Sequence, residues 1–182
     1  MRLFISGISC VGKTAIGQKL AELLGYYFFD LDDEIESFFS MPIEKLQDNY
    51  LTTHSCGQEA SKALVHVLDQ EESRNSVIAL PPSGLMNYYW RIVKKAEGIT
   101  IVLNDQAQNI LDRITFYDKN SVRIEKRLSP VEKAYYLRDI KKDITYFKRS
   151  YKRADISIDI SQLNIIESAQ RIKAEKEQFN LK

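Results

Sequence analysis

Residues 3–14 read LFISGISCVGKT, an apolar run that leads into a glycine-containing segment ending in lysine and threonine. The second part, Gly7 to Thr14, fits the pattern G-x-x-x-x-G-K-[ST] at every fixed position. Glycines let the backbone turn tightly, so that its N–H groups can point inward at a phosphate. A helix that begins near Lys13 adds the positive end of its dipole. The stretch therefore predicts a strand, a phosphate-binding loop and a helix in succession.

The last two residues of this loop have separate tasks in such a site. Lys13 would reach the β and γ phosphates of ATP and act in catalysis, and the Thr14 hydroxyl would ligate Mg²⁺. A glycine-rich turn that binds nothing is the alternative, but the apolar strand before the loop and the amphipathic helix after it favour the phosphate loop. The residues expected at the nucleotide are Gly7, Ser9, Cys10, Val11, Gly12, Lys13 and Thr14.

Short apolar runs alternate with longer periodic segments along the rest of the chain. The runs expected as strands are residues 3–6, 27–29, 77–80, 99–103 and 156–160. Helical periodicity marks residues 13–24, 53–72, 85–96, 107–115, 131–150 and 165–178. All the strands but the last are almost continuously apolar, which is typical of strands covered on both faces. The alternation favours an α/β fold with a parallel sheet.

Length and composition limit the class of protein. The chain has 182 residues, of which 44% are hydrophobic, and a formal net charge of +1. This length suits one domain over residues 1–182. The charge does not favour nucleic acid or an acidic membrane as partner, and no apolar run approaches the roughly 20 residues of a membrane helix. We therefore expect a cytoplasmic monomer that binds neither nucleic acid nor membrane.

Two carboxylates follow the second predicted strand. Ligands gather at the carboxyl ends of parallel strands, so Asp30 and Asp32 would lie beside the phosphate loop. Asp30 could hold Mg²⁺ through water, and Asp32 could take the proton of an acceptor hydroxyl. An acidic helix N-terminus is the alternative interpretation. We favour that alternative for Asp33 and Glu34, and a functional role for Asp30 and Asp32.

The same segment resembles the shikimate kinase family. Its pattern F-x-D-x-D-x-x-I-E is matched by Phe28, Asp30, Asp32, Ile35 and Glu36. Further family segments have counterparts at residues 42–46, 77–79, 111–113 and 154–159. The likeness extends from Met1 to about Arg171. It implies a three-layer α/β/α phosphate-loop kinase fold with a parallel five-stranded sheet and a mobile lid at about residues 116–130.

The resemblance also implies an activity. MgATP would give its γ-phosphoryl group to a hydroxyl of a small metabolite, with shikimate as the first choice of acceptor. Asp30 would serve Mg²⁺, Asp32 would face the acceptor hydroxyl, and a lid arginine would close over the γ-phosphate. Arg127 falls at that place, with Arg123 in reserve. A guanidinium can steady the charge on the transferring group, while a solvated basic face is the other interpretation.

Three departures from the family fall on the acceptor side. The family's G-G-G loop is here Pro81-Pro82-Ser83 followed by Gly84, which removes two backbone donors. Lys62 replaces a carboxylate-gripping arginine and lacks its planar fork. Tyr146 replaces a second arginine, and Arg149 follows three residues later. The aromatic run at residues 88–90 is interpreted as helix packing rather than a cleft wall.

Two interpretations of the acceptor side stay open. In the first, Lys62 and Arg149 rebuild the grip on the same acid. In the second, the chain phosphorylates a different hydroxylated metabolite, or it is a regulatory nucleotide-binding protein that has lost transfer. The residues expected at the acceptor are Asp32, Lys62, Ser83, Gly84 and Arg149.

Overall fold

Five parallel strands form the central sheet of the computed structural model, which describes residues 1–179 and residue 181. The strands are β1 (Arg2–Ser6), β2 (Tyr27–Asp30), β3 (Ser76–Ala79), β4 (Gly98–Asn104) and β7 (Ile156–Asp159). Their order across the sheet is β2-β3-β1-β4-β7. Each strand overlaps one of the apolar runs, so the prediction of a parallel five-stranded sheet is confirmed.

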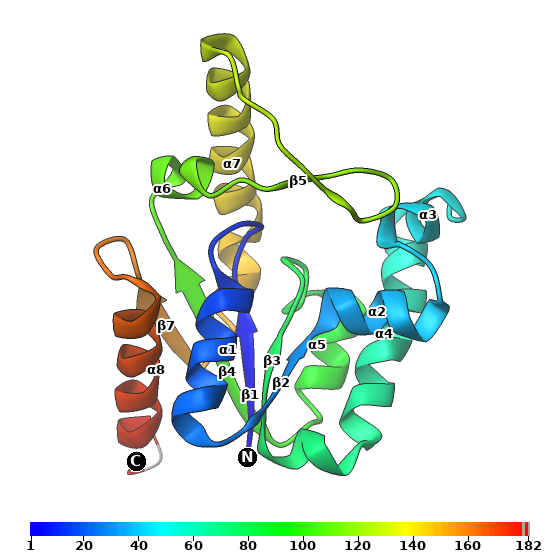
Figure 1. Cartoon of the computed structure of the whole chain (residues 1–182). Coiled ribbons are helices and arrows are strands. Elements are labelled where there is room, and N and C mark those ends of the chain that lie inside the picture. Colours follow the sequence, from blue (N-terminus) through cyan, green and yellow to red (C-terminus); the bar gives the residue numbers. More distant parts are fainter. Residues whose placement is uncertain (180, 182) are drawn as a thin grey trace.

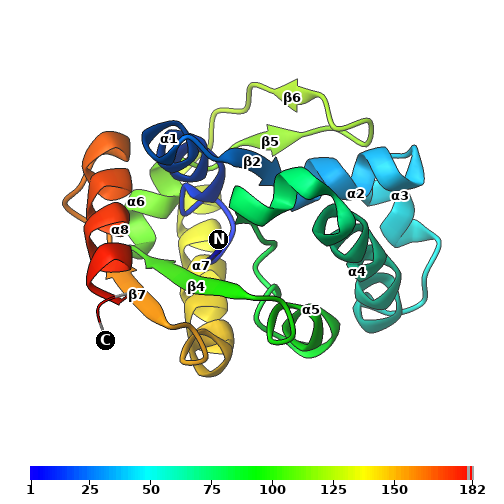
Figure 2. The same ribbon diagram turned by 90° about the horizontal axis from the view of Figure 1, so that it is seen from below.

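Helices cover both faces of the sheet (Figure 2). One face packs against α1 (Lys13–Leu24) and α8 (Ile165–Phe179), and the other against α4 (Thr53–Asp69) and α5 (Asn87–Val93). Successive side chains of a strand point to opposite faces. Leu3 and Ile5 accordingly lie in the core under α1 and α8, whereas Phe4 lies in the core under α4 and α5. The apolar residues 3–5 of β1 thus contribute to the cores on both faces of the sheet. The prediction of a three-layer α/β/α fold is confirmed.

The remaining helices surround the carboxyl ends of the strands (Figure 1). They are α2 (Leu31–Phe39), α3 (Ile43–Asp48), α6 (Ala107–Asp112) and α7 (Pro130–Tyr151). A 3₁₀ helix, η1 (Glu71–Asn75), lies at the opposite end of the sheet, directly before β3. α7 begins far above the sheet and descends towards it. No helix of the described residues combines the length and the apolar character needed to cross a membrane.

Three predicted helices are shorter in the structure, and the one expected at residues 107–115 ends at Asp112. The helix expected at residues 53–72 ends at Asp69, because Gln70 takes an extended conformation with ψ of 145°. The helix expected at residues 85–96 begins only at Asn87. Residues 81–86 instead form turns, in which Gly84 N–H donates to the Pro81 carbonyl at 2.8 Å.

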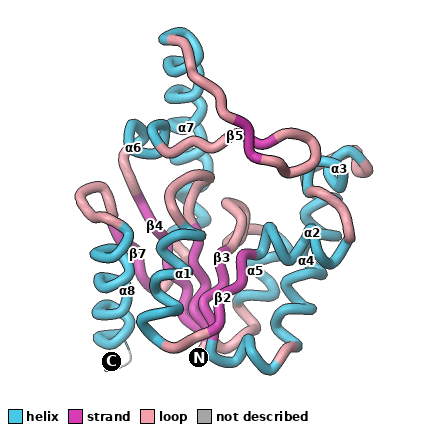
Figure 3. Tube along the Cα trace, viewed as in Figure 1, coloured by secondary structure: helices cyan, strands magenta, loops and turns pink. Residues whose placement is uncertain are grey.

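The segment predicted as a lid carries a short hairpin. β5 (Phe116–Tyr117) and β6 (Arg123–Ile124) pair in antiparallel fashion, which the sequence pattern did not predict. Asp118 closes the turn by accepting from the backbone N–H of Val122 at 2.9 Å. In Figures 1 and 3 the segment leaves α6, crosses above the sheet towards α3 and returns to the start of α7.

Candidate active site

The phosphate loop joins β1 to α1 in a conformation that depends on its glycines. Gly7 has φ of 151° and Gly12 has φ of 107°, values that L side chains rarely adopt. A Cβ on Gly7 would lie 2.9 Å from the Leu103 carbonyl oxygen of β4. Cys10 also has a left-handed φ, 59°, although it carries a side chain. A strained non-glycine residue of this kind is typical of functional loops.

The start of α1 opens into this loop. Gly12 is its N-cap and supplies no side-chain acceptor, so the first backbone N–H groups of the helix lack a side-chain cap. Such donors and the helix dipole together favour a bound anion. Phosphate oxygens are therefore the ligands that suit the end of this helix.

Lys13 lies across the loop. Its ammonium donates to the carbonyl oxygens of Gly7 at 3.1 Å and Ile8 at 3.0 Å. Burial lowers the pKa of Lys13, while the carboxylates of Asp32 and Asp30 oppose this shift. The site thus brings one cation and two carboxylates within electrostatic reach of one another.

Thr14 and Asp30 form a direct pair. The Thr14 hydroxyl donates to Asp30 Oδ2 at 2.6 Å. The other oxygen of Asp30 accepts from the backbone N–H of Asp32 at 3.1 Å, so that Asp30 also caps α2. Mg²⁺ prefers oxygen ligands and is usually bound through one or two carboxylates together with substrate phosphates. The hydroxyl and the carboxylate, side by side at the loop, fit that requirement.

Asp32 lies in the first turn of α2, together with Asp33 and Glu34, which match the expected acidic helix start. It lines a cavity of about 390 Å³ between α2, α3 and α4 and keeps an exposed surface there. The pKa of the Asp32 carboxyl is raised to about 6, and the largest cause is desolvation of the carboxyl by the surrounding protein. Asp30 adds to that rise, and the Lys13 ammonium opposes it. A carboxylate with this pKa suits a general base near neutral pH.

A second cavity of about 480 Å³ adjoins the first. The two share the lining residues Thr53, Gly57, Ser83 and Tyr89, and we call them together the Asp32 cleft. Tyr89 and Trp90 pack in the core as expected of residues 88–90, but Tyr88 is only half-buried and lines the cleft as well. The sequence could not reveal this, because it depends on which face of the short helix α5 meets the cleft.

Only some of the residues expected at the acceptor line the Asp32 cleft. Asp32 and Ser83 line the Asp32 cleft, but Gly84, Lys62 and Arg149 do not. A Cβ on Gly84 would collide with Leu80 at 2.5 Å, because the residue is buried in the turn. Lys62 is exposed and forms an ion pair with Glu59 at 2.6 Å. Arg149 is exposed on α7.

The tip of the lid touches the elements that carry the cleft. Lys45 of α3 donates to the Asn120 side chain at 2.9 Å. The Ser121 hydroxyl donates to Glu36 Oε1 of α2 at 2.5 Å. The same Glu36 oxygen accepts from the backbone N–H of Ile43 at 2.9 Å. The lid therefore bridges the gap between α6 and the α2–α3 segment above the site.

Both candidate lid arginines lie on this bridge. Arg123 is part of β6, and Arg127 follows it before α7 begins. The side chains of both residues are exposed. Between them, Lys126 pairs with Glu132 of α7 at 2.9 Å. This ion pair ties the end of the lid to the first turn of α7.

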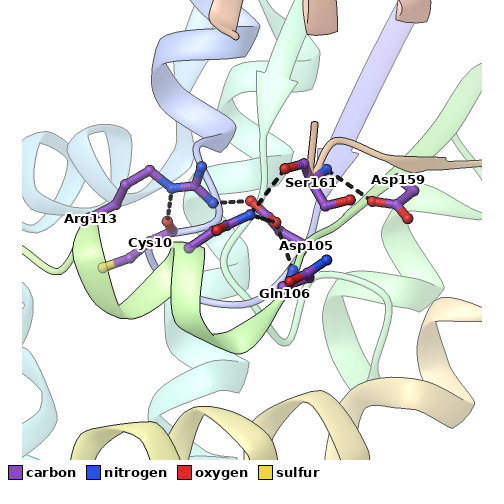
Figure 4. A network of polar contacts seen from close by, with 7 residues as sticks. Cys10, Asp105, Gln106, Arg113, Asp159 and Ser161 are labelled. Carbon is purple, nitrogen blue, oxygen red and sulfur yellow. Dashed lines mark hydrogen bonds and ion pairs between the residues drawn. The ribbon is translucent and has the colours of Figure 1, made fainter. Parts of the chain in front are cut away.

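A polar network fixes the phosphate loop from the other side (Figure 4). The Arg113 side chain donates to the Cys10 carbonyl at 3.4 Å and pairs with Asp105, whose side chain is fully buried. Asn109 donates to Asp105 at 2.7 Å and to the Ser161 carbonyl at 3.1 Å. The loop, α6 and the segment after β7 are thus joined. The sequence analysis gave Asp105 no role, although it follows an apolar strand much as Asp30 ends β2.

Comparisons with known proteins agree with this arrangement. The model of the family described as Shikimate kinase matches residues 9–175. A shikimate kinase from Thermoanaerobacter pseudethanolicus is 26% identical over 173 residues, which cover 93% of this chain and 92% of that protein. One from Mesorhizobium japonicum is 30% identical over 111 residues, which cover 60% of this chain and about half, 52%, of that protein.

A solved structure of a shikimate kinase matches this chain over its whole length. The shikimate kinase from Acinetobacter baumannii in complex with shikimate has a TM-score of 0.72 and 25% identity, and the match covers 100% of this chain and 95% of that chain. The family model covers the phosphate loop from Ser9 onwards, the Asp30 to Asp32 segment, residues 116–130 and β7. The chain belongs to the shikimate kinase family.

Proposed function

We propose that this chain transfers the γ-phosphoryl group of MgATP to a hydroxyl of a small metabolite. The observation that carries the proposal is the Thr14 to Asp30 hydrogen bond of 2.6 Å, because it joins the phosphate loop to the carboxylate segment. Shikimate is the reference acceptor, since the relatives are named for it and one is solved with it. With that acceptor the product would be shikimate 3-phosphate, and the role would lie in aromatic amino acid biosynthesis.

In the proposed reaction, the chain mainly positions the two substrates and neutralises the charge on the phosphate groups. The loop N–H groups and Lys13 would hold the phosphates, and Asp32 would take the proton from the acceptor hydroxyl. When bound, Mg²⁺ would supply charge neutralisation on the phosphate oxygens, and Thr14 and Asp30 are the residues that would hold it. Arg127 of the lid would add a bidentate donor to the transferring group. Phosphoryl transfer through a loose transition state needs little more than this.

The role of Asp32 distinguishes a kinase from a protein that only binds nucleotide. Asp32→Asn should stop acceptor-dependent ADP formation and leave the ATP affinity nearly unchanged, because the base faces the acceptor rather than the phosphates. Steady-state kinetics and calorimetric titration with ATP measure the two quantities. A large loss of ATP affinity would show that Asp32 belongs to the nucleotide site and would remove it as the base.

A second candidate keeps the reaction and changes the acceptor. The specific observation that favours it is the position of Lys62 and Arg149, which lie outside the Asp32 cleft. A purely regulatory nucleotide-binding protein is a weaker candidate, because such a protein needs no carboxylate with a raised pKa in a cleft beside the phosphate loop. ADP formation in the presence of different hydroxylated compounds separates these candidates.

A further inference from the structure

The lining of the Asp32 cleft carries little positive charge. Neither lysine nor arginine is among its described lining residues. Asp32 supplies a carboxylate, and the imidazole of His54 is the one basic side chain among the described lining residues. His54 Nε2 already shares a hydrogen bond of 2.6 Å with the Tyr88 hydroxyl. An acid in this cleft would meet a carboxylate of its own sign.

Three cations on the surrounding elements are engaged elsewhere. Lys45 donates to Asn120 of the lid, and Lys62 pairs with Glu59 on α4. Arg153, after α7, donates to the Leu85 carbonyl at 2.7 Å and lies over the Trp90 ring. None of these three cations lines the cleft.

Arg91 of α5 lies near the cleft, but its guanidinium lies over the ring of Tyr88, which lines the cleft. Its guanidinium carbon is 5.8 Å from the centre of the Tyr88 ring, and Arg91 is not a lining residue. A cation held against a ring gains from that contact. Moving it into the cleft would give up this interaction.

Neutral polar groups and aromatic rings make up much of the wall instead. Gln47, Thr53 and Ser83 line the cleft, and their side chains have no hydrogen-bond partner among the described residues. Tyr50 and Tyr89 add rings, each with a hydroxyl at its edge. Amides and hydroxyls both donate and accept, so they match the hydroxyls of a ligand, while the rings cover its apolar face.

The balance of these groups decides the acceptor class. A carboxylate that leaves water needs a cation or several donors to repay its desolvation. A hydroxyl needs only one or two neutral partners. We infer that the acceptor is an uncharged polyol of about the size of a monosaccharide, and that a carboxylate is not required for its recognition. This inference rests on the proposed phosphoryl transfer.

Matched pairs of acceptors test the inference directly. Shikimate is compared with its carboxamide, and gluconate with glucitol, using wild-type protein and MgATP. We expect kcat/KM for ADP formation to be at least tenfold higher for the uncharged member of a pair. Equal or higher values for the acids would overturn the inference.

Calorimetric titration of the same compounds, with MgADP present, separates this result from failure of the kinase proposal. If no compound raises ADP formation, phosphoryl transfer fails, and the dissociation constants still decide the acceptor class. Tighter binding of the uncharged member supports the inference. Tighter binding of the acid, or binding of neither, overturns it.

A gain-of-charge variant gives an independent test. Tyr146 lines the cleft and is 66% exposed, so its replacement should not disturb the fold. Tyr146→Arg should raise the ratio of kcat/KM for the acid member to kcat/KM for the uncharged member at least tenfold. Tyr146→Gln is the matched control without charge. If Tyr146→Arg leaves the ratio between the two members unchanged, another cation already holds the acid and the inference fails.

Discussion

Thr14 donates its side-chain hydroxyl to Asp30 Oδ2 across 2.6 Å, so two motifs that are 16 residues apart in the sequence meet at one point. Thr14 lies in the first turn of α1, which follows β1, and Asp30 ends β2. β1 and β2 are both hydrogen-bonded to β3 and run parallel to it. Their carboxyl ends therefore lie at the same edge of the sheet, which places the loop and the carboxylate together.

Asp30→Asn and Asp30→Ala separate the two roles of this residue. Asparagine still caps α2 but has no charge, so we expect the Mg²⁺ concentration for half-maximal activity to rise about 10- to 100-fold, with little change in Tm. Alanine also loses the cap, which should cost about 1 kcal/mol of unfolding free energy. Magnesium titrations and thermal melts measure these effects. An unchanged Mg²⁺ dependence in Asp30→Asn would remove Asp30 from the metal site.

Asp32 should make the protein less stable at neutral pH. Its pKa is raised to about 6 in the folded protein, above the value of about 3.9 for an unfolded chain, so the unfolded state favours the ionised form. The loss of stability caused by ionised Asp32 is absent below about pH 4 and complete above about pH 6. We therefore expect a higher Tm for Asp32→Asn than for wild type at pH 8, and nearly equal values at pH 4. A lower Tm of the variant at pH 8 would mean that Lys13 stabilises the ionised carboxylate.

The two lid arginines should differ in their effect on kcat. If Arg127 donates to the transferring group, Arg127→Ala should lower kcat by about 10²- to 10³-fold, as removal of one such donor does in other enzymes. Arg127→Lys should recover only part of this, because lysine lacks the planar fork. Arg123→Ala is the matched control on the same hairpin segment. A larger loss of kcat in Arg123→Ala than in Arg127→Ala would show that Arg123, and not Arg127, donates to the transferring group.

The contacts at the lid tip should hold the lid against α2 and α3. The double change Lys45→Ala and Ser121→Ala removes one exposed and one part-buried hydrogen bond, each worth about 1 kcal/mol. We expect cleavage within residues 116–130 by a nonspecific protease to become up to about fivefold faster, with Tm nearly unchanged. Lys119→Ala, on the same turn, serves as control. Equal cleavage of the double variant and wild type would show that these contacts do not restrain the lid.

The sequence predicted the parts of the protein that depend on local patterns. Almost continuous apolar runs identified four of the five strands, because both faces of the sheet are covered, and the alternating run at residues 156–160 identified β7. The phosphate loop followed from fixed spacing, and the Asp30 to Asp32 segment from its place after a strand. Each of these features lies within a few neighbouring residues.

Features that depend on side-chain direction were missed. Asp105 has a role only because Asn109 of α6 and Arg113, the C-cap of that helix, approach it. Lys62 stands where the family has an arginine, but Glu59, three residues before it on the helix, holds its charge outside the cleft. In both cases the outcome depends on side-chain direction, which spacing alone does not supply.

The central claim is transfer of the γ-phosphoryl group to a hydroxyl with the help of Lys13, and ³¹P NMR tests it most directly. Wild type and Lys13→Ala are incubated with MgATP and a set of hydroxylated acceptors that includes shikimate and uncharged polyols. We predict that wild type forms a new phosphate monoester together with an equal amount of ADP, and that Lys13→Ala, folded as judged by its Tm, forms neither. Equal turnover by Lys13→Ala and wild type, or ADP without any phosphate monoester, would contradict the account.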